Sequence, residues 1–162
     1  MARLGEMLSI FASADSVTEQ TADMGTTAFT TKAVYGNASS LMIATRPGGY
    51  HSLPHLHDCE QLNWLQCGEL WVFVENRAIH MRAGDFLRIP AGERHWSWNK
   101  TTAPCTLVEV HTPGLHADPL ISDYAVGLHE QDEIPHFLGS PVNQFLSADS
   151  DFDPAVAESG AA

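Results

Sequence analysis

Two histidines stand one residue apart in the segment HLH, at His55 and His57. Residues i and i+2 of an extended strand project from the same face, roughly 6.5 to 7 Å apart. Pro54, directly before them, favours such an extended segment and opposes a helix. Two imidazoles on one face can converge on a single metal ion at bond lengths of about 2.1 Å. HxH alone is also typical of ordinary surface or core histidines, so a metal site needs support from the rest of the chain.

The chain around these histidines has the pattern of a β-protein. Short segments rich in β-branched and aromatic residues alternate with Gly, Pro, Asn and Asp. The expected strands are SLMIATR, EQLNWLQ, ELWVFVEN, AIHMRA, DFLRIP, RHWSWN and CTLVEVH. Their spacing of about 8 to 12 residues, without a helical period between them, predicts an all-β sandwich or barrel over residues 31–113. Residues 1–30 are expected to form an irregular N-terminal arm, and residues 114–162 a C-terminal extension with a solvated acidic tail.

Length and composition exclude several classes of function. A chain of 162 residues, 44% of them hydrophobic, is enough for one domain with a normal core. The net charge of −12 opposes binding to nucleic acids or to anionic membrane surfaces. No apolar segment approaches the roughly 20 residues of a membrane span, and the N-terminus is a poor signal peptide. Cys59, Cys67 and Cys105 match no disulfide or CxxC spacing, which predicts a reduced, cytoplasmic protein.

The histidine pair belongs to a longer pattern. From Gly49 to Gly68 the chain reads Gly, five residues, HxH, three residues, an amide at Gln61, six residues, Gly. From Gly84 it reads Gly, five residues, PxGxxH ending at His95, three residues, Asn. Two motifs of this length in this order resemble the paired sequence motifs of the cupin superfamily.

The resemblance implies a small jelly-roll barrel, usually paired as a homodimer, with one divalent metal ion inside. It carries the ligand roles onto His55, His57, His95 and Gln61. Most relatives have a glutamate at the fourth position, and Glu60 is adjacent to it. Gln61 nevertheless satisfies both the three-residue gap after HxH and the six-residue gap before the glycine, whereas Glu60 satisfies neither.

A neutral amide at the fourth position changes the expected chemistry. Three imidazoles and an amide oxygen leave the full +2 charge on the ion, whereas a carboxylate would leave +1. One unit charge at about 4 Å is worth on the order of 4 kcal/mol at an effective dielectric constant of about 20. The ion is therefore expected to act as a Lewis acid rather than in redox chemistry. Zinc is the first choice, and iron, nickel, manganese and cobalt are alternatives, because imidazole ligands alone do not select one metal.

Four further residues are candidates for catalysis: His51, Arg88, Glu109 and His111. His51 precedes His55 by four positions and could share its face, and Glu109 shares a face with His111. Any of these three could accept a proton near the metal, or could instead be an ordinary surface or outer-face residue. Arg88 stands among apolar residues, where it could pair with an internal carboxylate or hold an anionic group of a substrate.

Aromatic residues crowd the predicted strands: Trp64, Trp71, Phe73, Phe86, Trp96 and Trp98. Strand alternation places Trp96 and Trp98 on the face opposite to His95, where they would pack against a partner subunit or the terminal arms. The other four are expected to contribute to an aromatic-lined cavity that suits a large, flat, apolar substrate.

Within the cupin resemblance, HDCEQLNWLQCGELWVFVEN and PAGERHWSWN are similar to the cupin-type polyketide cyclases of bacterial aromatic polyketide antibiotic biosynthesis. This similarity implies a metal-dependent enzyme that closes rings of a poly-β-ketone by aldol chemistry. That reaction needs a polarised carbonyl, a stabilised enolate and a proton acceptor, which His51, His111 or a metal-bound hydroxide could provide. The alternatives are a dioxygenase of quercetinase type, a metal-dependent lyase or isomerase of a small substrate, and a non-catalytic binding cupin.

Overall fold

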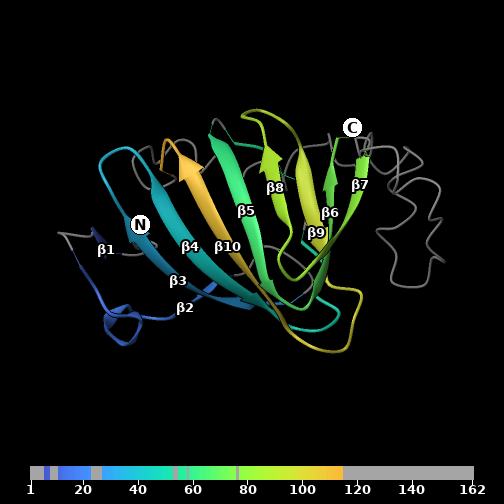
Figure 1. The fold of residues 1–162 in the computed structure, drawn as a ribbon, viewed down its shortest axis with the longest axis horizontal. Coiled ribbons are helices and arrows are strands. Elements are labelled where there is room, and N and C mark those ends of the chain that lie inside the picture. Colours follow the sequence, from blue (N-terminus) through green and yellow to red (C-terminus); the bar gives the residue numbers. More distant parts are fainter. Residues whose placement is uncertain are drawn as a thin grey trace.

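The computed structural model describes residues 6–7, 11–22, 27–52, 55–57, 59–75 and 77–114. Within these residues the chain forms two β-sheets and one short 3-10 helix, Ala14–Ser16 (Figure 1). The fold is therefore all-β, as the sequence predicts. This described part of the chain contains no helix with the length and hydrophobicity of a membrane-spanning segment.

The larger sheet has seven strands. Their bounds are β1 Glu6–Met7, β2 Gln20–Ala22, β3 Phe29–Tyr35, β4 Ser40–Arg46, β5 Glu60–Cys67, β8 Phe86–Ile89 and β10 Cys105–Thr112. They are ordered β1–β3–β4–β10–β5–β8, with β2 paired to β3. The smaller sheet, ordered β7–β6–β9, consists of β6 Glu69–Val74, β7 Arg77–Arg82 and β9 His95–Trp98. The seven segments expected to be strands are confirmed as β4 to β10.

Strand alternation decides which side chains enter the space between the sheets. In β5 the buried residues Gln61, Asn63 and Leu65 alternate with exposed ones. Directly opposite them on β10 lie His111, Glu109 and Leu107, which are also buried. The inner face of this strand pair is therefore polar at one end and apolar at the other.

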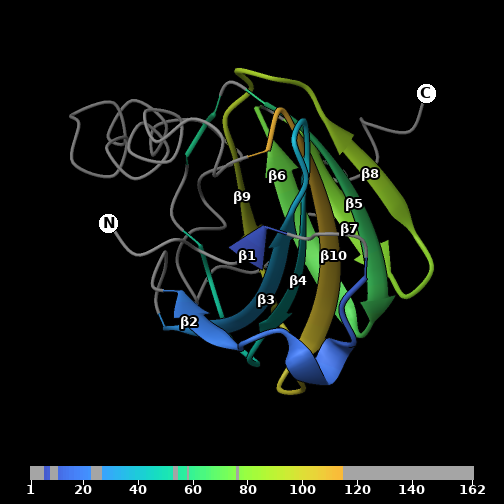
Figure 2. The same ribbon diagram turned by 90° about the vertical axis from the view of Figure 1, so that its left-hand side faces the viewer.

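The apolar end joins the two sheets. Its buried residues come from both sheets and are Leu65, Leu70, Val72, Val74, Met81, Ile89, Cys105 and Leu107. Full burial of each large aliphatic side chain stabilises the fold by about 1.5–3 kcal/mol. Figure 2 shows the resulting arrangement, with β6 and β9 of the smaller sheet lying beside the curved larger sheet.

The turn between β5 and β6 depends on Gly68. Its φ of 82° lies in the left-handed region, and a Cβ at this position would come within 2.7 Å of the Cβ of Cys105. A side chain here would therefore strain the backbone and clash with β10. Gly68 thus helps to fix where β5 ends, and with it the register that turns alternate residues of β5 inward.

The ends of the chain were predicted to lie outside the barrel. The N-terminal arm, residues 1–30, contributes β1 and β2, which pair with β3 at the edge of the larger sheet. The predicted C-terminal extension, residues 114–162, lies outside the described residues apart from Gly114. The domain boundaries at residues 31 and 113 stay predictions.

Candidate metal centre

His55, His57 and His95 come together from segments that are distant in the sequence. The backbones of His55 and His95 exchange two hydrogen bonds, of 3.0 and 2.8 Å, where the chain at His55 runs beside β9. The ring centroid of His95 lies 4.3 Å from that of His55 and 4.8 Å from that of His57. One ligand atom of each ring lies within 4.8 Å of the other two. Nitrogens this close could hold a single metal ion.

Backbone carbonyls orient two of these rings. Nδ1 of His57 lies 3.1 Å from the carbonyl oxygen of Cys59, and Nδ1 of His95 lies 2.9 Å from that of Glu93. A carbonyl oxygen only accepts, so each Nδ1 donates its proton and each Nε2 keeps a lone pair. Nε2 of His95 is buried and has no hydrogen-bond partner among the residues that the structure describes. Metal-binding histidines typically have this arrangement, because their second nitrogen donates to a carbonyl or carboxylate.

Gln61 brings a further polar atom to these histidines. Its Oε1 lies 3.1 Å from Nε2 of His57. When His57 donates through Nδ1, both of these atoms are acceptors, and their contact is repulsive unless a cation lies between them. Two ligands of one ion at bond lengths of about 2.1 Å lie roughly 3 to 3.5 Å apart. The residues therefore fit a divalent ion, and this donor set does not choose among zinc, iron, nickel, manganese and cobalt.

The pleat of β5 separates Gln61 from Glu60. Gln61 is only 5% exposed and lies opposite His111 on β10. Glu60 faces outward, where its Oε2 accepts a hydrogen bond of 2.5 Å from Nε of Arg88. Of these two positions, 61 is therefore the one from which a side chain reaches the histidine cluster, at His57. The role of Gln61 as a metal ligand stays a prediction.

A buried ion pair lies behind Gln61. Oε1 of Glu109 accepts a hydrogen bond of 2.6 Å from Nη2 of Arg46. Burial alone would raise the pKa of Glu109, but the charge of Arg46, and of His111 when it is protonated, holds this pKa below its ordinary value. Burial alone would lower the pKa of Arg46, and Glu109 raises it above its ordinary value. Both members of the pair are therefore charged.

His111 lies on the other side of Glu109. Its Nε2 is 3.7 Å from Oε2 of Glu109, and its ring centroid is 5.6 Å from that of His57. Burial lowers the pKa of His111 to about 4, against the opposing effect of Glu109. Burial also lowers the pKa of His57, and burial together with His55 and His57 places the pKa of His95 well below its ordinary value. These imidazoles are therefore neutral at pH 7, the state in which histidine binds metals.

The structure thus brings two of the four predicted catalytic residues, Glu109 and His111, to the histidines. The expectation that His51 shares the face of His55 is wrong. His51 pairs with Trp98, whereas His55 pairs with His95, so the register shifts by one residue between these two bridges. His51 therefore lies beside Trp98, with ring centroids 5.8 Å apart, on the face opposite to His95.

Arg88 also lies away from the histidines. Strand β8 turns Leu87 and Ile89 toward the inner residues of β5, so Arg88 faces outward together with Phe86. Its side chain is exposed and paired with Glu60. The expected pairing of Arg88 with an internal carboxylate is therefore wrong, and its expected role in holding an anionic group of a substrate stays a prediction.

The arginine that enters the barrel is Arg46, which the sequence analysis did not identify. It ends the segment SLMIATR in the same alternation as Ser40 and Ala44, which are also buried. That alternation is the signal that could have found it. A charged residue directly before the PGG turn is more typical of an exposed strand end.

The aromatic residues face away from the histidines. The strand registers place Trp71, Phe73, Trp96 and Trp98 on the outer face of the smaller sheet, and Trp64 and Phe86 on that of the larger sheet. The placement of Trp96 and Trp98 opposite to His95 is confirmed, whereas the predicted aromatic lining of the site by the other four is wrong. A different aromatic pair, Phe29 and Tyr50, is buried and flanks the guanidinium of Arg46, at 5.2 and 5.9 Å from the ring centroids.

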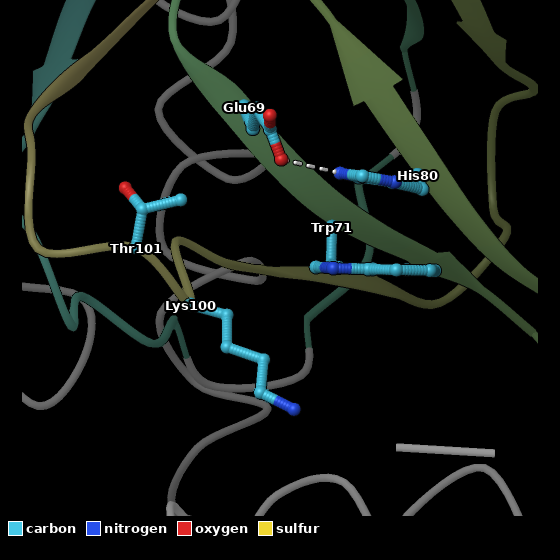
Figure 3. Close-up of a pocket in the computed structure, with 5 residues that line it drawn as sticks. All are labelled: Glu69, Trp71, His80, Lys100 and Thr101. Atoms are coloured by element: carbon cyan, nitrogen blue, oxygen red, sulfur yellow. Dashed lines mark hydrogen bonds and ion pairs between the residues drawn. The ribbon is translucent and has the colours of Figure 1, made fainter. Parts of the chain in front are cut away.

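An open pocket lies on the outer face of the smaller sheet (Figure 3). Its lining residues are Glu69, Trp71, His80, Lys100 and Thr101. The rings of Trp71 and His80 stack at 4.4 Å, and Glu69 lies 3.0 Å from Nε2 of His80. Trp71 and His95 lie on opposite faces of the sheet, so this pocket is separate from the three histidines.

Comparisons with known proteins agree with the fold. Residues 41–111 match the family model of the cupin domain, so the predicted resemblance to the cupin superfamily is confirmed over this part of the chain. A search of curated protein sequences found no match.

Three solved structures illustrate the similarity. An RmlC-like cupin from Shewanella frigidimarina has 16% identity and a TM-score of 0.57, over 64% of this chain and 89% of that one. A predicted oxalate decarboxylase from Thermotoga maritima has 16% identity and a TM-score of 0.60, over 64% and 99%. KdgF from Halomonas sp. has 17% identity and a TM-score of 0.58, over 65% and 94%. Identities this low show a shared fold and leave the activity to be argued from the site.

Proposed function

We propose that the protein is a metal-dependent enzyme that catalyses aldol ring closure of a poly-β-ketone. The observation that carries this proposal is the neutral donor set, three imidazoles with the amide oxygen of Gln61 turned toward His57. Among the described residues, the cluster that could hold an ion contains no carboxylate. A divalent ion held by these residues would supply Lewis-acid polarisation of a carbonyl with its full +2 charge.

His111 is the residue placed to accept a proton. Its Nε2 faces the carboxylate of Glu109 at 3.7 Å, which favours the tautomer with the proton on Nε2. Its Nδ1 is buried and has no hydrogen-bond partner among the described residues, so this nitrogen keeps a lone pair for a substrate proton. The negative charge of Glu109 would stabilise the imidazolium that forms.

The substrate class is supported by the sequence and by the apolar end of the barrel. The segments around both motifs resemble cupin-type polyketide cyclases. The aliphatic side chains that continue the inner face beyond the polar end, such as Leu65 and Leu107, pack between the sheets and would close that end of the site to water. A small-molecule substrate that is largely apolar or aromatic, a homodimeric assembly and a cytoplasmic location belong to the same proposal.

Two measurements test this function. Elemental analysis of protein purified without chelator is expected to find about one divalent ion per chain, and His95→Ala is expected to lose it. Added to a polyketide synthase reaction, the wild-type protein is expected to change the ring-closure pattern of the products, whereas His95→Ala is not. An unchanged pattern with metal-loaded protein would refute the cyclase. Oxygen consumption with flavonols or catechols would instead favour the quercetinase-type dioxygenase.

A further inference from the structure

The side-chain amide of Gln61 is held from both ends. Its Oε1 lies 3.1 Å from Nε2 of His57. At its other end, Nε2 donates hydrogen bonds to Oδ1 of Asn63 at 2.8 Å and to Oε2 of Glu109 at 3.3 Å. All four side chains are at most 5% exposed, so solvent offers the amide no other partners.

Of the two neighbours at the Nε2 end, only one can fix which end of the amide faces the histidines. Asn63 carries both a donor and an acceptor, so it can match either orientation of Gln61 by turning its own amide. A carboxylate only accepts hydrogen bonds, and the other oxygen of Glu109 is paired with the guanidinium of Arg46 at 2.6 Å. The NH₂ group of Gln61 must therefore point to Glu109, which directs its carbonyl oxygen to the histidines.

We propose that Glu109, itself held by Arg46, is a positioning residue that orients the amide oxygen of Gln61 toward the metal. The inference rests on the proposed metal site and adds a residue that sequence spacing does not assign to it. Most relatives carry a carboxylate at the ligand position itself. Here the carboxylate of Glu109, on β10, instead lies behind Gln61 and contacts the nitrogen of its amide. Its hydrogen bond to the amide makes Oε1 a more basic ligand, while the paired charge of Arg46 offsets that of Glu109.

Replacement of the carboxylate by an amide is the direct test. Glu109→Gln presents a group that can donate as well as accept, so it no longer imposes one orientation on Gln61. We expect metal affinity, measured by competition with a chelator, to fall by about 10- to 100-fold. The absorption spectrum of the cobalt(II)-loaded protein is expected to change, because the oxygen ligand is altered. Glu60→Gln, the same substitution one position from Gln61 but on the outer face, should change neither.

A second background, the Gln61→Ala protein, distinguishes the positioning role of Glu109 from a merely structural one. If Glu109 acts through Gln61, then in a Gln61→Ala protein the further change Glu109→Gln should alter metal affinity by less than about twofold. An equal loss in both backgrounds would overturn the inference. Glu109→Gln also leaves Arg46 buried without its carboxylate, so Arg46→Met/Glu109→Gln, which removes both charges, should show the same loss of affinity in a stable protein.

The outcomes also separate this inference from the proposed function. Wild-type protein that binds no metal would overturn both. Wild-type protein that binds metal, with a Glu109→Gln variant of unchanged affinity and cobalt(II) spectrum, would overturn the positioning role of Glu109 alone.

Discussion

Two arginine–glutamate pairs of nearly equal length lie in opposite surroundings in this protein. Nη2 of Arg46 is 2.6 Å from Glu109, and Nε of Arg88 is 2.5 Å from Glu60. The side chains of the inner pair are 9% and 4% exposed, whereas those of the outer pair are 61% and 40% exposed. Both pairs join neighbouring strands of the larger sheet, β4 to β10 inside and β5 to β8 outside.

The difference shows that burial, rather than distance, decides what such a pair can do. Water and salt screen an exposed pair, which contributes about 0.2–1 kcal/mol. A buried charge that loses its partner costs about 3–5 kcal/mol, because no solvent replaces the partner. Only the inner pair contacts the candidate site, through the hydrogen bond from Gln61 to Glu109. The inner pair can therefore influence chemistry at the histidines, and the outer pair has no such connection among the described contacts.

Removal of each arginine should give the largest contrast. Arg46→Met leaves the carboxylate of Glu109 buried and unpaired, and we expect the free energy of unfolding to fall by about 3–5 kcal/mol. The matched change Arg88→Met on the outer face should cost less than about 1 kcal/mol. Urea unfolding of both variants in chelator, with wild type beside them, measures the difference. Equal losses would mean that burial does not distinguish the two pairs.

An added carboxylate beside the inner pair should have the next largest effect. Gln61→Glu replaces a hydrogen-bond donor, 3.3 Å from Glu109, by a second acid. Without metal, the variant is expected to be less stable by about 1–3 kcal/mol, because a hydrogen bond to a charged group becomes a like-charge contact.

With metal bound, the same carboxylate should be retained as a ligand and lower the electrophilicity of the ion. Urea unfolding with and without metal separates the two effects. The control variant Gln66→Glu, on the exposed side of β5, should change the free energy of unfolding in neither condition. A metal-free Gln61→Glu protein as stable as wild type would show that Glu109 does not face position 61 as a charged group.

The inner pair also lies beside His111, whose proton binding makes the stability of the fold depend on pH. Burial places the pKa of His111 at about 4, below the ordinary 6.5 that it regains on unfolding. Between these values the unfolded chain binds more protons than the folded one, so stability falls as pH falls. In metal-free protein, His111→Phe should therefore lose about 1.5 kcal/mol less than wild type between about pH 6.5 and about pH 5. Urea unfolding at both pH values tests this, and identical losses would contradict it.

The parts of the molecule that the sequence predicts correctly are those that depend on local pattern. Alternation and turn residues identified β4 to β10, and counting the gap from His57 to Gly68 selected Gln61, which does lie on the inner face of β5. The three histidines converge because each motif fixes its own short segment, and the segment at His55 lies beside β9, which carries His95.

The errors concern pairings between distant segments. The face of His51 depends on a one-residue register shift between its bridge to Trp98 and that of His55 to His95, which strand alternation cannot anticipate. Strand β8 is apolar on both faces, with Phe86 exposed and Ile89 buried, so its pattern does not show which way Arg88 points. Arg88 was expected inside and Arg46 was not considered, because only the pairing of the strands separates inside from outside.

The smallest effect is expected from the outer pair itself. A double-mutant cycle of Arg88→Ala and Glu60→Ala should give a coupling of about 0.2–1 kcal/mol in urea unfolding, and high salt should reduce it further. Elemental analysis should find the metal content of all three variants equal to that of wild type, because Glu60 faces away from the histidines. A Glu60→Ala protein that lost its metal would transfer the ligand role from Gln61 to Glu60. The outer pair would then be the one connected to the site, and the contrast between the two pairs would be reversed.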